Sequence, residues 1–250
     1  MRILFLAPRL PHHRSISGAH IVFQRMRRLM DAGHDVGLAC FMNDADEYNR
    51  NKVPEDLLEL HCIHEPSKQY FKPQHLKYGP ASEATSFSRY YSPPMLKTVG
   101  EMVQHSRYDV VIAEYTAMGQ YLSRNPYLPA VRKIVSVHES ATLNCRKIME
   151  LLPHSAQKLK NAWRLRQVRD IEMGIYRTAD RVLTLTPEEK ALFAAADGDV
   201  LNAPCAAWHR DFAERAEALG FGIIWSLSYE LFDAYCRGDW KQRASDGAPA

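Results

Sequence analysis

The chain has 250 residues, of which 46% are hydrophobic and 24% are charged, with 12 glycines and 14 prolines. This composition is typical of a globular protein and excludes collagen-like, low-complexity and wholly disordered chains. The formal net charge of +3 hides an asymmetry, because residues 197–250 carry five basic and nine acidic side chains whereas residues 1–196 carry 27 and 20. The positive surplus of the first part is mild. It is compatible with an anionic ligand or membrane surface and does not indicate nucleic-acid binding.

The five cysteines, at positions 40, 62, 145, 205 and 236, are far apart and form no C-x-x-C motif. They predict neither a disulfide framework nor a thiolate metal site, and they fit a reducing, cytoplasmic environment. No apolar run approaches the ~18 residues that a membrane-spanning helix needs. The apolar stretch at the amino terminus is too short for a signal peptide, so we expect a β-strand there.

Strands and helices are predicted to alternate over residues 1–196. The first strand, helix and second strand, at 2–7, 19–30 and 35–41, form a βαβ unit whose crossover implies parallel strands. Residues 43–92 are less regular, with a short helix expected at 55–60 and a strand at 62–64. Further elements are expected as helices at 93–106, 117–123, 156–178 and 188–195 and strands at 109–113, 133–137 and 181–186. The pattern predicts an α/β fold, a Rossmann-like, doubly wound and mostly parallel sheet whose ligands lie at the carboxyl ends of the strands.

The alternation stops near residue 196. We expect domain boundaries at 1–196 for the Rossmann-like domain, 197–207 for a junction, and 208–250 for an irregular α/β tail. The reversal of charge at the junction supports this division.

The loop of residues 8–18 (PRLPHHRSISG) joins the first strand to the first helix, where helix N–H groups can bind an anion. Ser17 and Gly18 allow close approach of a ligand. Four residues of the loop are candidates for contact with an acidic one: Arg9, His12, His13 and Arg14. An ordinary serine-capped helix start and a solvated basic loop remain alternatives. The loop has neither G-x-G-x-x-G nor G-x-x-x-x-G-K-[ST], so it predicts no dinucleotide cofactor and no P-loop.

Two polar pairs follow buried strands at the same edge of the predicted sheet. His138 and Glu139 follow residues 133–137, and Glu114 and Tyr115 follow residues 109–113. A histidine in this place can donate a hydrogen bond or carry a proton, although it can also cap the next segment. Position 142 is threonine, so the pair is no H-E-x-x-H zinc motif, and no metal site is predicted. The absence of G-x-S-x-G gives no basis for a serine-hydrolase site.

The predicted helix at 156–178 has six basic residues and two acidic ones. Such a face can bind anionic lipid headgroups, which makes peripheral contact with the inner membrane face a candidate property. A solvated face is the alternative.

The first 41 residues resemble the amino-terminal domain of GT-B glycosyltransferases, specifically glycosyltransferase family four. Gly33, His34, Asp35 and Val36 match the element that enters the second strand in that family, and Ser17-Gly18 stands where the family has a glycine pair. Residues 169–193 (RDIEMGIYRTADRVLTLTPEEKALF) are similar to the segment that ends the same domain. The resemblance implies retaining transfer of a sugar from a nucleotide diphosphate sugar to a glycan, lipid-linked or small-molecule acceptor. It places Gly18 near the donor phosphates or the acceptor, and it gives His138 a catalytic place beside the transferred sugar. The remaining candidate substrate-binding residues are Ser17, His13, Arg14, Glu139 and Glu114.

The sequence departs from this family after residue 196, because nothing in it matches the second, donor-binding domain. Residues 208–250 instead resemble a fragment of the TIM-barrel-like module of phage-tail and gene-transfer-agent proteins. We therefore expect a truncated glycosyltransferase-like protein that needs no cofactor beyond its donor substrate and that is inactive or nearly so without a second chain supplying the donor domain. The alternative is a non-catalytic binding or phage-tail-like assembly protein.

Overall fold

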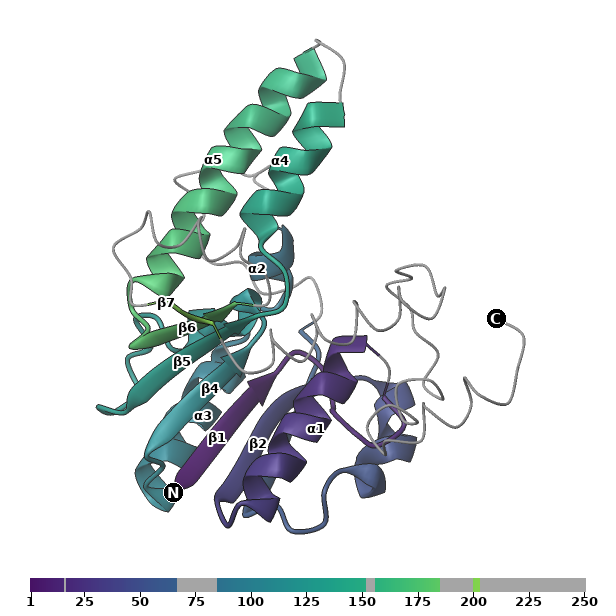
Figure 1. Ribbon diagram of the computed structural model, residues 1–250, viewed down its shortest axis with the longest axis vertical. Helices are drawn as coiled ribbons and strands as arrows, with labels where there is room; N and C mark the ends of the chain where they lie inside the picture. The colour runs from purple at the N-terminus through teal and green to yellow at the C-terminus, as the bar shows by residue number, and fades with distance from the viewer. Residues whose placement is uncertain (16, 67–84, 152–155, 185–199, 203–250) are drawn as a thin grey trace, which may run out of the picture.

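The computed structural model describes residues 1–15, 17–66, 85–151, 156–184 and 200–202. In these ranges seven strands form one sheet in the order β3-β2-β1-β4-β5-β6-β7, and each neighbouring pair is parallel (Figure 1). The expected tail at 208–250 and the expected helix at 188–195 lie outside the described residues. The predicted α/β class with a parallel, Rossmann-like sheet is confirmed.

The elements follow one another as the βα pattern requires. The strands are β1 (Arg2–Ala7), β2 (Asp35–Met42), β3 (Glu59–His64), β4 (Val110–Glu114), β5 (Arg132–Val137), β6 (Arg181–Thr184) and β7 (Val200–Asn202). The α-helices are α1 (Ser17–Asp31), α2 (Thr85–Arg89), α3 (Pro93–Ser106), α4 (Ala141–Leu151) and α5 (Ala156–Tyr176), and 3-10 helices form at Asp44–Lys52 and Thr116–Tyr121.

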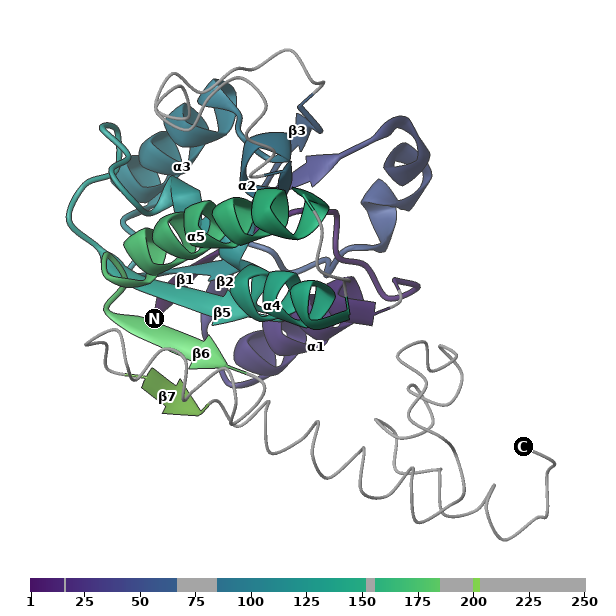
Figure 2. The same cartoon turned by 90° about the horizontal axis from the view of Figure 1, so that it is seen from above.

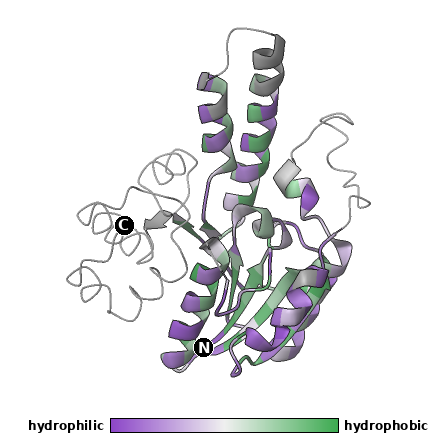
Figure 3. Cartoon of the chain, turned by 90° about the vertical axis from the view of Figure 1, so that its right-hand side faces the viewer, coloured by the Kyte–Doolittle hydropathy of each residue, from purple (hydrophilic) through white to green (hydrophobic). Residues whose placement is uncertain are grey.

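The sheet separates two apolar cores because side chains alternate along each strand. On β1, Phe5 packs toward α1 beside Val22 and Met26. Leu4 belongs to the other core, which includes Val99 of α3 and residues of α5. Figure 2 shows α1 on one side of the sheet and α3 and α5 on the other, and Figure 3 shows the apolar strands between helices with polar outer surfaces. Strands that are buried on both faces explain the continuous apolar runs in the sequence.

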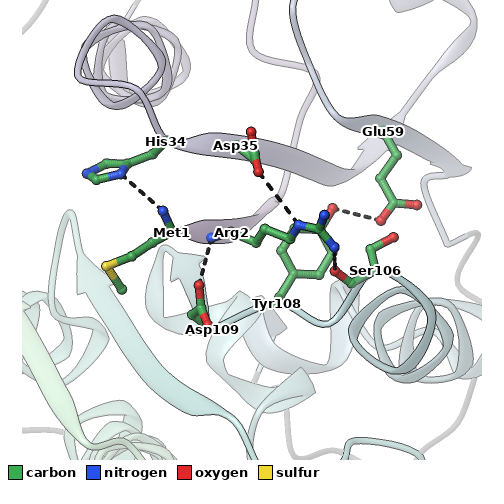
Figure 4. A network of polar contacts seen from close by, with 8 residues as sticks. All are labelled: Met1, Arg2, His34, Asp35, Glu59, Ser106, Tyr108 and Asp109. Atoms are coloured by element: carbon green, nitrogen blue, oxygen red, sulfur yellow. Dashed lines mark hydrogen bonds and ion pairs between the residues drawn. The ribbon is translucent and has the colours of Figure 1, made fainter.

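The amino-terminal edge of the sheet is closed by aspartates that precede strands. The Asp109 carboxylate accepts a hydrogen bond from the backbone N–H of Arg2 at 2.8 Å, and Asp180 accepts one from Lys133 at 2.7 Å. Figure 4 shows the first of these within a network in which the Arg2 guanidinium donates to the Ser106 carbonyl at 2.8 Å. These contacts occupy the edge opposite the predicted site.

The long arm of the molecule consists of α4 and α5, which extend side by side away from the sheet (Figure 1). The sequence predicted α5 but not α4. The residues predicted as a helix at 55–60 are instead a turn followed by the start of β3, so that prediction is wrong. The backbone N–H of Leu58 donates to the Val36 carbonyl at 2.8 Å, which shows that this segment pairs with β2.

Strand order reverses between β1 and β4, since the chain extends the sheet outward through β2 and β3 and then returns to the other side of β1. The connections on either side of this point leave the sheet in opposite directions. Open α/β sheets bind ligands in the crevice that this arrangement creates at the carboxyl ends of the strands.

Candidate functional site

Three segments meet at the carboxyl edge of the sheet around the β1–β4 switch point. They are the loop that follows β1, Glu114 and Tyr115 at the end of β4, and His138 and Glu139 after β5. Register places Leu6 beside Ala113, and Glu114 beside Ser136, so these segments are neighbours across the sheet. The three segments share one edge, as the sequence predicts, because the strands that they follow are parallel.

Glu114 is fully buried and is the centre of a polar triad. One carboxylate oxygen accepts a hydrogen bond from the Arg25 guanidinium at 2.5 Å, and the other lies 2.8 Å from Nε2 of His138. Arg25 also donates to the Ser136 hydroxyl at 2.9 Å. Burial alone would raise the pKa of Glu114, but the charge of Arg25 and the hydrogen bonds from His138 and Ser136 lower it to about 2. The carboxylate is therefore ionised at neutral pH.

The ionised carboxylate fixes the orientation of His138. Because an ionised carboxylate can only accept hydrogen bonds, Nε2 of His138 carries the proton and donates a hydrogen bond to Glu114. Nδ1 is left on the other side of the ring, facing Gly18 at the start of α1. His138 thus presents a nitrogen acceptor to the amino end of α1 when neutral, and its side chain is only 5% exposed.

Tyr115 covers His138. The two rings stack with centroids 4.0 Å apart and an interplanar angle of 11°. The backbone of Tyr115 has φ 68° and ψ 142°, a combination that non-glycine residues rarely adopt and that marks local strain. Burial, together with the charges of Glu114 and Glu139, raises the pKa of its phenol to about 12, so the hydroxyl stays protonated.

The Tyr115 hydroxyl occupies the side of Gly18 that a side chain would take. A Cβ at position 18 would lie 1.6 Å from this oxygen and 3.1 Å from Nδ1 of His138. In this structure the glycine thus makes room for a tyrosine over the catalytic candidate. Contact of Gly18 with a donor phosphate or an acceptor stays a prediction.

A cavity of about 760 Å³ opens beside this cluster. Of the predicted site residues, Arg14, Gly18 and Glu139 line it, while Glu114 and His138 belong to the buried triad next to Tyr115. His13 is exposed, and its Nδ1 lies 3.1 Å from the Lys52 carbonyl. Ser17 is the first residue of α1. The remaining lining includes Arg9, Leu10, His12, Asp46, Phe87, Arg89, Tyr90, Tyr115 and Thr116.

Arg25, Asp46 and Arg89 are charged residues of this region that the sequence did not single out. Arg25 lies on α1 between Val22 and Met26, which face the core, so a basic residue among inward-facing positions was the available signal. Arg89 lies on α2, in a stretch without clear periodicity.

A second buried carboxylate, Glu172 of α5, supports the segment that follows His138. It accepts hydrogen bonds from the backbone N–H groups of Ala141 and Thr142, each at 3.0 Å, and from the Ser140 hydroxyl at 3.1 Å. Tyr176 donates to it at 2.9 Å. Glu172 therefore satisfies the first N–H groups of α4 from another helix.

In the described ranges, no group of three His, Cys, Asp or Glu side chains is placed to share a metal ion. None of the helices in those ranges is long and apolar enough to cross a bilayer.

A family model matches the last part of the sequence. The family model for the non-contractile tail sheath protein TIM barrel matches residues 176–250, a range that begins at the last residue of α5 and includes β6 and β7. No curated protein sequence matches the chain.

The fold has relatives among solved structures. Sucrose-phosphate synthase from Thermosynechococcus elongatus superposes with a TM-score of 0.55 at 15% identity over 82% of this chain and 48% of that one. UGT2 of Phytolacca americana, complexed with UDP-2fluoro-glucose and pterostilbene, has a TM-score of 0.47 at 13% identity, over 84% of this chain and 57% of that one. Anabaena Alr3699/HepE in complex with UDP has a TM-score of 0.46 at 12% identity, over 88% of this chain and 50% of that one. The chain thus spans about half the length of these proteins, and the described part of it has the fold of one half of a GT-B glycosyltransferase.

Proposed function

We propose that the chain is the acceptor-side half of a retaining GT-B glycosyltransferase of the family-four type. Its reaction moves a sugar from a nucleotide diphosphate sugar to a glycan, lipid-linked or small-molecule acceptor. The observation that carries the proposal is the buried Arg25–Glu114–His138 triad, which lies beside a cavity at the switch point of the sheet. Ligands bind at this place in open α/β folds.

In this reaction His138 positions the transferred sugar. Glu114 holds the Nε2–H, so Nδ1 is oriented toward the cleft side of α1 and accepts a hydrogen bond from a sugar hydroxyl there. Tyr115 stacks on the same ring and occupies this space, so it moves aside when the sugar binds. The strained backbone of Tyr115 favours such a displacement.

The remaining half of the enzyme binds the donor. The chain covers 48% of sucrose-phosphate synthase, and one domain alone cannot hold donor and acceptor in line for transfer. We propose that a separate chain supplies the donor domain and that the protein has little or no transferase activity without it.

The test uses the purified chain with a panel of nucleotide diphosphate sugars. Titration calorimetry measures binding, and released nucleotide measures turnover, with and without proteins that copurify from the source cells. We expect turnover only when a donor-domain chain is present, and His138→Ala to lower it by at least about 100-fold. His105→Ala, on an exposed position of α3, is the matched control. Failure of every copurified chain to restore turnover would contradict the proposal.

A second candidate function rests on the family match at residues 176–250. Under it, the chain is a non-catalytic binding or tail-assembly protein in which the last part of the sequence matters. Deleting residues 204–250 discriminates between the two, because loss of folding or of partner binding supports assembly, whereas intact folding with retained ligand binding supports the glycosyltransferase half.

Peripheral membrane contact is proposed through the helical arm. Exposed basic residues lie on both of its helices, among them Arg146, Lys147, Arg166 and Arg169, and Trp163 is 52% exposed. Basic side chains with an interfacial tryptophan bind anionic headgroups. Sedimentation with phosphatidylglycerol vesicles tests this, and Arg166→Gln with Arg169→Gln is expected to weaken binding.

A further inference from the structure

The cavity beside Tyr115 has a cationic lining. Its lining residues include three arginines, Arg9, Arg14 and Arg89, together with His12, against two acidic residues, Asp46 and Glu139. A volume of about 760 Å³ lies within the range of small-molecule sites. The positive end of the α1 dipole, at Gly18 and Ala19, lies in the same lining. The residues that line the cavity therefore carry an excess of positive charge.

One of the two carboxylates is already engaged within its own turn. Asp46 accepts a hydrogen bond from the backbone N–H of Asn43 at 3.0 Å, and its own N–H donates to the Asn43 side chain at 3.1 Å. Asp46 is thus held to the start of the 3-10 helix. It offsets the arginines less than a free carboxylate would.

His12 offers a neutral donor. Its Nδ1 accepts a hydrogen bond from the backbone N–H of Arg14 at 3.2 Å, which leaves the proton on Nε2. Burial and the nearby positive charge of Lys52 lower the pKa of His12, so it is neutral near pH 7. An uncharged N–H donor next to guanidinium groups suits the oxygens of an anion.

The arginines differ in how firmly they are held. Arg89 forms an ion pair with Glu65 at 3.0 Å, and its guanidinium lies 5.6 Å from the centre of the Tyr90 ring. Arg9 and Arg14 are exposed, and neither forms an ion pair with any residue in the described ranges. Their guanidinium groups are therefore available to bind an anion in bidentate fashion.

Aromatic rings complete the lining. Phe87, Tyr90 and Tyr115 border the same cavity as the arginines. Aromatic side chains offer apolar faces to a ligand with carbon–hydrogen groups, such as a sugar ring, while the arginines select a phosphate. An uncharged sugar would leave the cationic groups without a partner.

We infer that this cavity binds a phosphorylated sugar, with Arg14 and Arg9 on the phosphate and Tyr90 against the ring. Its assignment as the acceptor rests on the proposed function, whereas binding of the phosphorylated sugar itself does not. The same phosphate chemistry occurs in soluble sugar phosphates and in lipid headgroups, so the experiment separates these sources.

The experiment titrates the full chain with glucose 6-phosphate, glucose and inorganic phosphate. We expect glucose 6-phosphate to bind more tightly than either part, and Arg14→Gln to weaken its binding about tenfold, with a larger loss in the Arg9→Gln/Arg14→Gln double variant. Arg132→Gln is the matched control, because Arg132 is an exposed arginine at the opposite edge of the sheet, where β5 begins. Equal affinity for glucose 6-phosphate and inorganic phosphate, or equal loss in Arg14→Gln and Arg132→Gln, would overturn the inference.

A second arm tests the lipid source with phosphatidylcholine vesicles that do or do not contain phosphatidylinositol. Vesicle binding that glucose 6-phosphate displaces and that Arg14→Gln weakens assigns the phosphate to a lipid headgroup in the same cavity. Binding of glucose 6-phosphate without such displacement assigns it to a soluble acceptor.

The outcomes also separate this inference from the proposed function. If glucose 6-phosphate binds through the arginines but no donor chain activates the protein, the cavity assignment stands and the proposed transferase function is contradicted. If the protein transfers sugar to uncharged acceptors and Arg14→Gln has no effect, the transferase function stands and the cavity assignment is contradicted.

Discussion

Two glycines at opposite edges of the sheet each face a tyrosine hydroxyl. A Cβ at Gly37 would lie 1.8 Å from the hydroxyl of Tyr108, just as one at Gly18 would lie 1.6 Å from that of Tyr115. At the amino edge the Tyr108 hydroxyl donates to Glu59 at 2.7 Å and is part of the network that closes the sheet (Figure 4). At the carboxyl edge the same steric arrangement places an aromatic ring over His138.

Gly18→Ala tests whether Tyr115 is held in this place. The new methyl group has to displace the Tyr115 ring, and we expect it to lower the free energy of unfolding by about 1–3 kcal/mol in a urea titration. Tyr115→Phe removes the clashing oxygen, so the double variant is expected to lose less stability than the sum of the single changes. Strict additivity would show that Tyr115 leaves Gly18 free in solution.

Glu114 makes stability depend on pH in a defined window. Its pKa is about 2 in the folded protein against an ordinary value of 4.5, so the unfolded state binds more protons between these values. Stability from this group is therefore complete above about pH 4.5 and is lost as the pH falls toward 2, by about 3 kcal/mol in total.

Glu114→Gln is expected to flatten that part of the pH profile and to cost about 3–5 kcal/mol at pH 7, because it leaves Arg25 without its charged partner. Urea unfolding at a series of pH values measures both effects. Glu55→Gln, on an exposed turn, is the control and should leave the profile unchanged. An unaltered acid slope in the Glu114 variant would show that other carboxylates cause it.

At the scale of elements, α4 depends on a residue of α5. Glu172 accepts from the first N–H groups of α4, so Glu172→Gln weakens this end of the helix while keeping the side chain's shape. We expect amide hydrogen exchange in residues 141–151 to become about tenfold faster or more, as the loss of charged hydrogen bonds implies. Asp170→Asn, exposed on the same helix, should not change it. Unchanged protection of α4 would show that Glu172 is not its cap.

Strands β2 and β3 place two thiols side by side. Cys40 and Cys62 are register partners with their sulfur atoms 3.8 Å apart. The hydrogen bond from Cys40 lowers the pKa of Cys62, whereas burial raises the pKa of Cys145. We expect iodoacetamide at pH 7.5 to alkylate Cys62 faster than Cys145, and Cys40→Ala to slow the reaction at Cys62, as peptide mass spectrometry can measure. A rate that Cys40→Ala leaves unchanged would contradict this assignment.

At the scale of the whole molecule, local signals explain what the sequence could predict. Strand β1 and helix α3 have the predicted bounds, because Pro8 follows the former and Ser92 with Pro93 begins the latter. The convergence of Gly18, Glu114 and His138 at one edge also follows from βα alternation alone. Helix α4 was missed because its cap, Glu172, lies about 30 residues further along the chain.

The finer geometry of the site was beyond prediction for the same reason. Which nitrogen of His138 faces Gly18 depends on Glu114, and the charge of Glu114 depends on Arg25 of α1. These contacts join residues 89 and 24 positions apart. Spacing in a single sequence carries no signal for them, whereas the order of strands does.

The central position of β1 has a consequence for synthesis of the protein. This strand is made before the other strands of the sheet, yet it lies between β2 and β4, so one of its edges has no partner until residues 110–114 have left the ribosome. The contact of Arg25 with Ser136 spans 111 residues. Long-range contacts of this kind form late and slowly. A nascent chain therefore exposes an apolar strand edge until β4 has emerged, and the buried triad cannot assemble before His138 has been made.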